Sequence, residues 1–252
     1  MSFAFKRLGA LLPLLLSACG YPSLPTGPIP VQRVPAPQAA ASHPLVIVLP
    51  GRGDDLNDLA DSGIAAAIQK AWPQADVLLA GATLGYYAEG RVAQRLHDEI
   101  IAPAHAEGRK EIWLSGASMG GMGALLYEQR YPQDLTGLVL FAPYMGDPGL
   151  IQQVAAAGGP KSWDAGPVPT AVDAGNYQHE LWRSVQRWED PKDAQRIWLS
   201  GGDSDRFVQS THMLATLLPP DHYIEEKGGH AWPVWDAGAA VIFARIAAAH
   251  SH

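Results

Sequence analysis

The sequence of 252 residues is poor in cysteine and in positive charge. Its single cysteine, Cys19, excludes a disulfide within the chain. The chain has 18 Lys and Arg residues and 25 Asp and Glu residues, which gives a formal net charge of −7. Because binding to nucleic acid needs clustered Lys and Arg, we do not expect a nucleic-acid partner. His and Cys at metal-ligand spacing are also lacking, so we expect no metal site, and no cofactor is predicted.

The chain begins with an apolar run that is too short to cross a membrane. Leu8 to Leu16 are nine residues, whereas a spanning helix needs about 20. Lys6-Arg7 precede the run and the small residues Ser17-Ala18 follow it. This layout predicts a secretory signal peptide at residues 1–18, with a buried or frayed N-terminal helix as the alternative.

Leu16-Ser17-Ala18-Cys19 resembles the lipoprotein box of bacterial signal peptides. The resemblance implies cleavage before Cys19 and attachment of diacylglycerol, with fatty acyl chains such as palmitate, to that cysteine. The mature protein would then be extracytoplasmic and anchored to a membrane by lipid. Gly20 stands where an Asp retains lipoproteins in the inner membrane, which favours an outer membrane facing the periplasm if the source is Gram-negative.

Residues 19–43 are rich in proline and small polar residues and lack the apolar content of a packed core. Such sequences favour extended, polyproline-like backbone. We therefore expect a tether that carries no chemistry and could reach about 70 Å if fully extended.

From residue 44 onward, apolar strand-like runs alternate with helical stretches, which predicts a mostly parallel sheet with helices on both faces. The expected strands are Leu45–Leu49, Asp76–Ala80, Glu111–Leu114, Leu135–Phe141, Arg196–Leu199 and Tyr223–Glu225. The expected helices are Leu56–Ala71, Tyr86–Ala106, Gly120–Tyr131 and Ala237–Ala249.

Residues 146–191 interrupt this alternation of strands and helices. The segment is rich in Gly, Pro and Asp and contains four large aromatic residues, Trp163, Tyr177, Trp182 and Trp188. The segment is either a cap over an active site or a surface excursion whose aromatic side chains anchor it to the body.

Gly116-Ala117-Ser118-Met119-Gly120 matches the G-x-S-x-G pattern, which puts a serine on a tight turn between a strand and a helix. Side chains two residues before and after the serine would collide there, so glycine is required at both places. A short pattern arises by chance, but here a strand-like run precedes it and a small-residue helix follows it. Ser118 is therefore the candidate nucleophile.

A serine hydroxyl needs a base to accept its proton, and an acid to orient that base. His230 lies in Gly228-Gly229-His230, between the last expected strand and the last helix, and is the candidate base. Two carboxylates follow the strand at Arg196–Leu199. The spacing of Gly202, Asp205 and Val208 fits a G-x-x-D-x-x-V acid loop and favours Asp205, while Asp203 is expected to brace the turn.

The reaction also needs N–H donors for a developing oxyanion. The backbone N–H of Met119, directly after Ser118, is one candidate. The glycine-flanked Arg52, in Pro50-Gly51-Arg52-Gly53, offers the other, unless this loop is a plain tight turn. The adjacent Asp54-Asp55 are expected to cap the helix that follows.

Taken together, these motifs in residues 44–252 resemble the α/β-hydrolase superfamily, in which the serine, acid and histidine follow one another in this order. The motif Gly-Ala-Ser-Met-Gly-Gly is most similar to that of small carboxylesterases of the phospholipase/carboxylesterase and esterase D-like groups. A departure is Pro50, where many members have His.

The resemblance implies a serine esterase that acts on a small-molecule or lipid ester. Lysophospholipid and thioester cleavage use the same machinery, so they are alternatives. A different alternative is a non-catalytic envelope lipoprotein that keeps the fold as a binding module. The sequence does not choose an acyl length, an alcohol or an oligomeric state.

Overall fold

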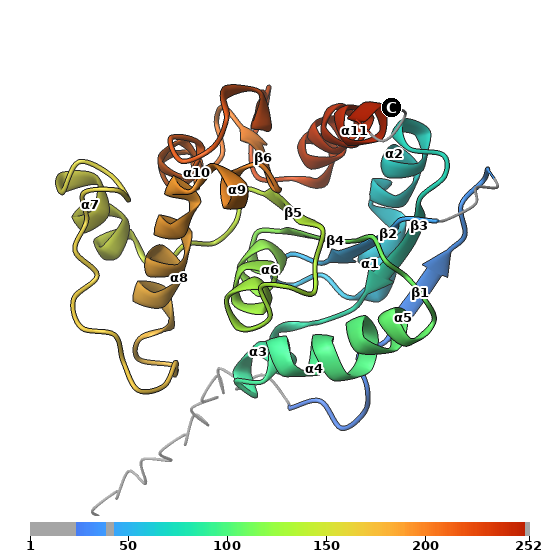
Figure 1. Ribbon diagram of the computed structural model, residues 1–252, viewed down its shortest axis with the longest axis horizontal. Helices are drawn as coiled ribbons and strands as arrows, with labels where there is room; N and C mark the ends of the chain where they lie inside the picture. Colours follow the sequence, from blue (N-terminus) through green and yellow to red (C-terminus); the bar gives the residue numbers. More distant parts are fainter. Residues whose placement is uncertain (1–23, 39–42, 250–252) are drawn as a thin grey trace, which may run out of the picture.

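The computed structural model describes residues 24–38 and 43–249 (Figure 1). The expected signal peptide and Cys19 lie outside the described residues. Seven strands form one sheet in the order β1-β3-β2-β4-β5-β6-β7. They are β1 Val31–Val34, β2 Leu45–Leu49, β3 Asp76–Ala80, β4 Ile112–Ala117, β5 Gly137–Phe141, β6 Ile197–Gly202 and β7 Tyr223–Glu226. Strands β2 to β7 are parallel, and β1 pairs with β3 in the antiparallel sense.

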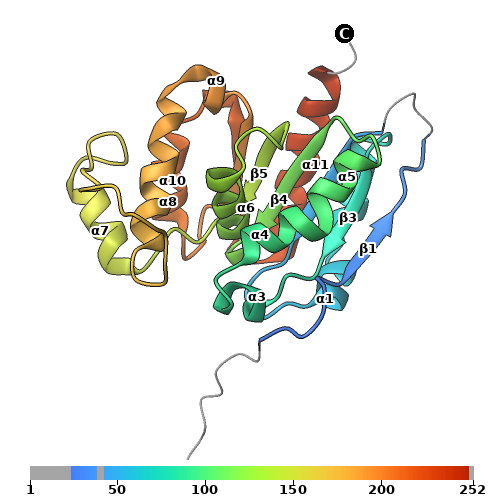
Figure 2. The same cartoon turned by 60° about the horizontal axis from the view of Figure 1, so that its bottom comes forward.

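Helices fill most connections between the strands (Figures 1 and 2). The α-helices are α1 Leu56–Asp61, α2 Ile64–Ala71, α3 Leu84–Ala88, α4 Val92–Leu96, α5 Ala102–Ala106, α6 Met119–Arg130, α7 Pro148–Ala156, α8 Tyr177–Gln186, α9 Pro191–Ala194, α10 Val208–Ala215 and α11 Trp232–Ala249. A π-helical turn, His97–Ile101, joins α4 to α5, and short 3₁₀ turns lie at Arg187–Glu189 and Pro220–His222.

The sheet is covered on both faces because successive side chains of a strand point to opposite sides. On one face, residues such as Ile47, Leu114 and Leu140 are buried against α4, α6, α8 and α10. On the other face, residues such as Val48 and Val139 are buried against α1, α2 and α11. Strands that are buried on both faces read as continuous apolar runs, and for this reason they were recognisable in the sequence.

Two long helices expected from the sequence are each broken at a glycine. The expected Leu56–Ala71 helix divides into α1 and α2 at Gly63, which has φ 96°. The expected Tyr86–Ala106 helix divides at Gly90, which has φ 73°, and passes through the π-helical turn. Because the left-handed region is open to glycine at little cost, apolar spacing alone does not reveal such breaks. The last helix, α11, begins at Trp232, earlier than expected.

The expectation that residues 19–43 form only a tether is wrong for the part described. Val31–Val34 pairs with Ala80–Val77 as an edge strand, and Ile29 is buried in the core. The folded body therefore begins near residue 29 and not at 44. The high proline content of residues 19–43 argues against a strand in the sequence. The strand forms all the same, because proline is compatible with the ends of edge strands.

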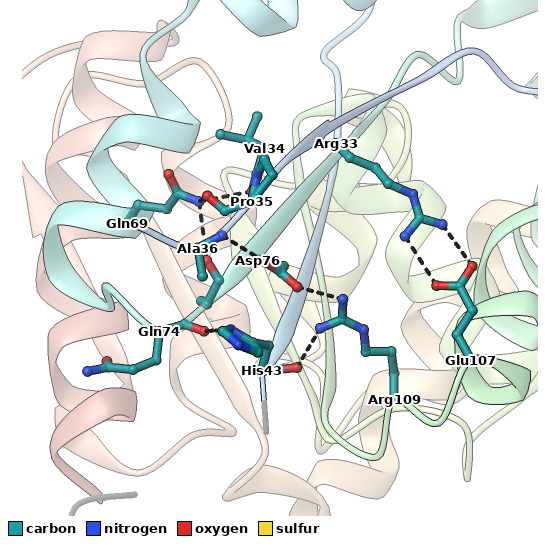
Figure 3. Close-up of polar contacts among 11 residues, drawn as sticks. Arg33, Val34, Pro35, Ala36, His43, Gln69, Gln74, Asp76, Glu107 and Arg109 are labelled. Atoms are coloured by element: carbon teal, nitrogen blue, oxygen red, sulfur yellow. Dashed lines mark hydrogen bonds and ion pairs between the residues drawn. The ribbon is translucent and has the colours of Figure 1, made fainter. Parts of the chain in front are cut away.

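Polar contacts hold the end of β1 to the body (Figure 3). Gln69 Nε2 donates to the carbonyl oxygens of Val34 and Pro35, at 2.9 Å each. The N–H of Ala36 donates to Asp76 Oδ1 at 2.7 Å, and the other oxygen of this carboxylate pairs with Arg109 Nη2 at 2.6 Å. Asp76 thus links the segment after β1 to the loop before β4.

Residues 146–191 contribute α7 and α8, at the end of the molecule away from β1 (Figures 1 and 2). Trp163, Trp182 and Trp188 are buried in the same core as α6. Glu128 of α6 is also buried and pairs with Arg187 and Arg196, on either side of α9. The aromatic side chains therefore anchor this segment to the body.

Candidate active site

Ser118 lies between β4 and α6 in a backbone conformation with φ 54° and ψ −112°. Non-glycine residues rarely adopt positive φ, and such strain persists only where surrounding structure enforces it. Here the Ser118 N–H donates to the carbonyl of Phe141 at 2.8 Å. The Ser118 carbonyl accepts from the N–H groups of Met122 and Tyr144 at 3.1 and 2.9 Å. These bonds to α6 and to the end of β5 fix the turn.

The two glycines of the motif are needed for steric reasons. A Cβ on Gly120 would lie 2.5 Å from the carbonyl oxygen of Leu49, at the end of β2. A Cβ on Gly116 would collide with the backbone of Gly120. Real Cβ atoms do not approach backbone this closely, so α6 can begin against β2 only with glycine at both positions.

His230 and Asp205 are in direct contact although they are 25 residues apart. His230 follows β7, and Asp205 follows β6, so both loops lie at the carboxyl edge of the parallel strands, where β4 leads into Ser118. His230 Nδ1 lies 2.8 Å from Asp205 Oδ2 and 2.9 Å from Oδ1. The Asp205 side chain is fully buried and also accepts from the N–H of Phe207 at 2.7 Å. A buried carboxylate in this place fixes the orientation of the imidazole.

Asp203 makes other contacts. Its carboxylate pairs with Lys227 Nζ at 2.6 Å and accepts from the N–H of Gly228 at 3.1 Å. The Lys227 hydrogen bond, with help from Gly228, holds the pKa of Asp203 below its ordinary value. Asp203 thus joins the loop after β6 to the loop that carries His230.

Aromatic rings enclose the His230 imidazole. Phe207 and Trp235 meet it edge to face, with centroid distances of 4.9 and 4.8 Å. Trp232 packs against Trp235, and its Nε1 donates to Asp54 Oδ2 at 3.0 Å. This bond, across 178 residues, ties the start of α11 to the loop after β2.

A cavity of about 390 Å³ brings these loops together. Its lining consists of Gly51, Arg52, Asp54, Ser118, Arg206, His230, Ala231, Trp232, Pro233 and Trp235. We call it the Ser118 cavity. The whole segment 146–191 lies within the described part of the chain and contributes no residue to this lining.

The arrangement brings together Ser118, His230 and Asp205, but one hydrogen bond of a triad is not formed. His230 Nε2 is buried and has no hydrogen-bond partner among the described residues, Ser118 included. Hydrogen bonds of this kind are often long before substrate binds. His230 Nε2 is therefore free to accept a proton from the Ser118 hydroxyl.

The two residues expected to donate to an oxyanion lie near Ser118, one next to it in the chain and one in the lining of the Ser118 cavity. Met119 begins α6 directly after Ser118, and Arg52 lines the Ser118 cavity. A Cβ on the neighbouring Gly51 would lie 3.9 Å from Ser118 Cβ, so the loop after β2 approaches the serine closely. Asp55, as expected, caps α1 by accepting from the N–H groups of Asn57 and Asp58.

Sequence reasoning missed several residues of the cavity. Trp232, Trp235 and Arg206 carry no motif of their own, and Asp54 was assigned to helix capping. For Trp232, Trp235 and Arg206, nearness to His230 or Asp205 in the chain is the one signal that the sequence offers. No group of His, Cys, Asp and Glu side chains in residues 24–38 and 43–249 is arranged to hold a metal ion. Over the same residues, no helix has the length and apolar character to span a bilayer.

Comparison with known proteins supports the fold. The Hydrolase_4 family model, described as serine aminopeptidase, S33, matches residues 94–191, less than half of the chain. This match includes Ser118 but not Asp205 or His230. No curated protein sequence matches.

Solved structures resemble most of the chain. A ferulic acid esterase has a TM-score of 0.56 at 15% identity, over 81% of this chain and 85% of its own. S-formylglutathione hydrolase FrmB from Staphylococcus aureus has a TM-score of 0.57 at 14% identity, over 83% of each chain. Est1E from Butyrivibrio proteoclasticus has a TM-score of 0.56 at 15% identity, over 86% and 92%.

The chain has the α/β-hydrolase fold: a mostly parallel sheet with helices on both faces. The fold class expected from the sequence is thereby confirmed. At these identities the likeness concerns the fold, and fold alone does not determine the reaction.

Proposed function

We propose that this protein is a serine hydrolase that cleaves carboxylic esters through an acyl-enzyme on Ser118. The observation that carries the proposal is the contact of 2.8 Å between the buried Asp205 carboxylate and His230, which lines the same cavity as Ser118. A histidine oriented in this way leaves Nε2 free to act on the serine hydroxyl.

The proposed reaction has two halves. In the first, Ser118 Oγ attacks the ester carbonyl and His230 Nε2 takes its proton, then gives that proton to the leaving alcohol. In the second, water attacks the acyl-enzyme with His230 again as base, and the acid is released. Asp205 stabilises the imidazolium, and the N–H groups of Met119 and Arg52 are the proposed donors to the oxyanion.

Esters are favoured over peptides because a carboxylic ester has the better leaving group and the described fold adds no gating domain above the cavity. Thioesters and lysophospholipids pass through the same tetrahedral intermediate, so they belong to the test set. A peptide substrate such as an aminoacyl 4-nitroanilide tests the activity named in the description of the matching family model.

The first experiment is labelling with a fluorophosphonate, which reacts with an activated serine. We expect the wild-type protein to be labelled and Ser118→Ala to remain unlabelled. Hydrolysis of 4-nitrophenyl butanoate should fall by about three orders of magnitude or more in the same variant. A folded wild-type protein that is neither labelled nor active would overturn the proposal in favour of a binding module.

We also propose that the protein is anchored to a membrane, outside the cytoplasm, by lipid on Cys19. The support is the lipoprotein-type sequence that ends at this residue. Cys19→Ser should move the protein from the membrane fraction to the soluble fraction of the producing cell. Membrane association that survives this substitution would argue against lipidation.

A further inference from the structure

Two arginine side chains of the Ser118 cavity have no anionic partner. Arg52 and Arg206 both line the cavity and are both exposed. Neither guanidinium makes a hydrogen bond or ion pair with any described residue. Every other arginine of residues 24–38 and 43–249 pairs with at least one oxygen atom; these are Arg33, Arg91, Arg95, Arg109, Arg130, Arg183, Arg187, Arg196 and Arg245. The two arginines without a partner among the described residues therefore both line the same cavity.

Arginines outnumber acidic residues in the lining of this cavity, whereas acidic residues are in excess over the whole chain. Asp54 is the one acidic residue in the cavity lining, and its Oδ2 already accepts a hydrogen bond from Trp232. Asp205 lies behind His230 and is engaged with it. In a chain with a formal net charge of −7, a cavity with two free guanidinium groups attracts anions, because the cavity walls concentrate the local field.

Arg206 lies against Phe207, whose ring also contacts His230, without using its hydrogen-bond donors. Its guanidinium carbon lies over the Phe207 ring, 5.1 Å from the centroid, and the same ring meets His230. Stacking of this kind places a guanidinium while its N–H groups remain free. These groups form a planar fork that matches a carboxylate or phosphate.

The order of the strands puts the two cations on opposite sides of Ser118. Arg52 follows β2, which pairs with one edge of β4, and Arg206 follows β6, which lies beyond the other edge of β4. An ester bound at Ser118 would thus have the loop of Arg52 on one side and the loop of Arg206 on the other.

We infer that the substrate is an ester that carries a carboxylate or phosphate group within a few bonds of the scissile carbonyl, and that Arg206 and Arg52 select it. This inference rests on the proposed ester hydrolysis. It deepens that proposal by giving the chemical class of substrate, which the triad alone leaves open.

Two matched substrate pairs test it. In the acyl arm, 4-nitrophenyl hemiadipate is compared with 4-nitrophenyl methyl adipate, whose carboxylate is masked. In the alcohol arm, the butanoyl ester of glycerol 3-phosphate is compared with glycerol monobutanoate. We expect kcat/KM of the wild-type protein to favour the anionic member about tenfold in one arm, which also identifies where the anion sits. This preference should shrink in high salt, since the arginines are exposed.

Variants assign the preference to residues. Arg206→Gln should lower the ratio of anionic to neutral kcat/KM about tenfold, mainly through KM, and Arg206→Lys should restore part of it. Arg130→Gln, an exposed arginine at the far end of α6, is the matched control and should leave the ratio unchanged.

The outcomes separate the two proposals. Neutral esters cleaved with no anionic preference in either arm, or a preference that neither Arg206→Gln nor Arg52→Gln changes, would overturn this inference and leave ester hydrolysis standing. Absence of turnover on all four esters, together with no fluorophosphonate labelling, would overturn both.

Discussion

Two carboxylates of the loop after β6, Asp203 and Asp205, show how position decides the role of a residue. They are two residues apart and chemically identical. Asp205 is buried against His230, whereas Asp203 faces Lys227 near the surface. The spacing to Val208 favours Asp205 as the acid, and Asp205 is the carboxylate of this pair that contacts His230.

The difference predicts unequal effects of the same substitution. Asp205→Asn should lower kcat for a 4-nitrophenyl ester by about three to four orders of magnitude, because the amide no longer stabilises the imidazolium or selects its tautomer. Asp203→Asn removes a surface ion pair and should cost less than about fivefold. Steady-state kinetics of both variants provide the measurement, and a larger loss for Asp203→Asn would contradict the assignment.

A third carboxylate, Asp236, is not part of the cavity lining and should influence stability. It is on α11 beside Gly63, and its Oδ1 is buried without a hydrogen-bond partner among the described residues. Burial raises the pKa of Asp236 to about 6. Because the folded-state pKa is above the ordinary value near 4, the stabilising effect of the protonated form is complete below about pH 4. It is lost as the pH rises through about 6.

Asp236→Asn should therefore stabilise the protein at pH 7 and not at pH 4. Since the group is only half buried, we expect about 1 kcal/mol, or roughly 2–4 °C in Tm for a domain of this size. Thermal denaturation at the two pH values measures it, with the exposed Asp61→Asn as control. An equal shift of Tm at both pH values would contradict this account.

At the scale of elements, α6 is the helix on which the site depends. It begins at Met119 with its glycines against β2, β4 and the end of β5. At its other end, buried Glu128 pairs with Arg187 and Arg196. The helix is thus fixed at both ends, and this fixes the position of Ser118, which directly precedes it.

Gly120→Ala should destabilise the protein by about 2 kcal/mol or more and lower turnover, because the new methyl group would meet the backbone of β2. Gly149→Ala, in α7, is the matched control: a Cβ there meets nothing within 4 Å. This control should be neutral or slightly stabilising, as alanine is the better helix former. Denaturant unfolding of both variants separates a steric effect from a general effect of losing glycine.

Individual elements differ in how far the sequence could predict them. β2 and β3 match their expected ranges because both faces are buried and the apolar runs are continuous. The breaks at Gly63 and Gly90 were missed because an amphipathic pattern continues across them. The same limit applies to the site: Ser118, Asp205 and His230 lie in local motifs, whereas the bond between Asp54 and Trp232 spans most of the chain and leaves no local signal.

At the scale of the whole molecule, β1 closes one edge of the sheet. Ile29 is buried, and the residues around it are bound to the helical layer: its N–H donates to Glu99 Oε2 at 2.6 Å. Tyr86 Oη donates to the carbonyl of Pro28 at 3.0 Å. The segment before the expected domain boundary is therefore part of the stable body.

A protein that begins at residue 37 should consequently be less stable than one that begins at residue 24. We expect a loss of about 2–3 kcal/mol from the burial of Ile29 alone, together with aggregation through the exposed edge of β3. Thermal unfolding and light scattering of the two truncated proteins measure these effects. Equal Tm values for both would show that β1 is dispensable.

The direction of β1 has a consequence for how the molecule can be attached to a surface. Val31 pairs with Ala80, at the carboxyl end of β3, so the chain enters the sheet at the edge that carries Ser118. α11 begins at the Ser118 cavity and extends about 27 Å away from it, so its last residue, Ala249, lies on the side opposite to the sheet's carboxyl edge (Figure 2). If the protein were immobilised on a solid support through its N-terminal segment, the mouth of the cavity would thus face the support. Immobilisation through the C-terminus would leave that mouth open to the bulk solution.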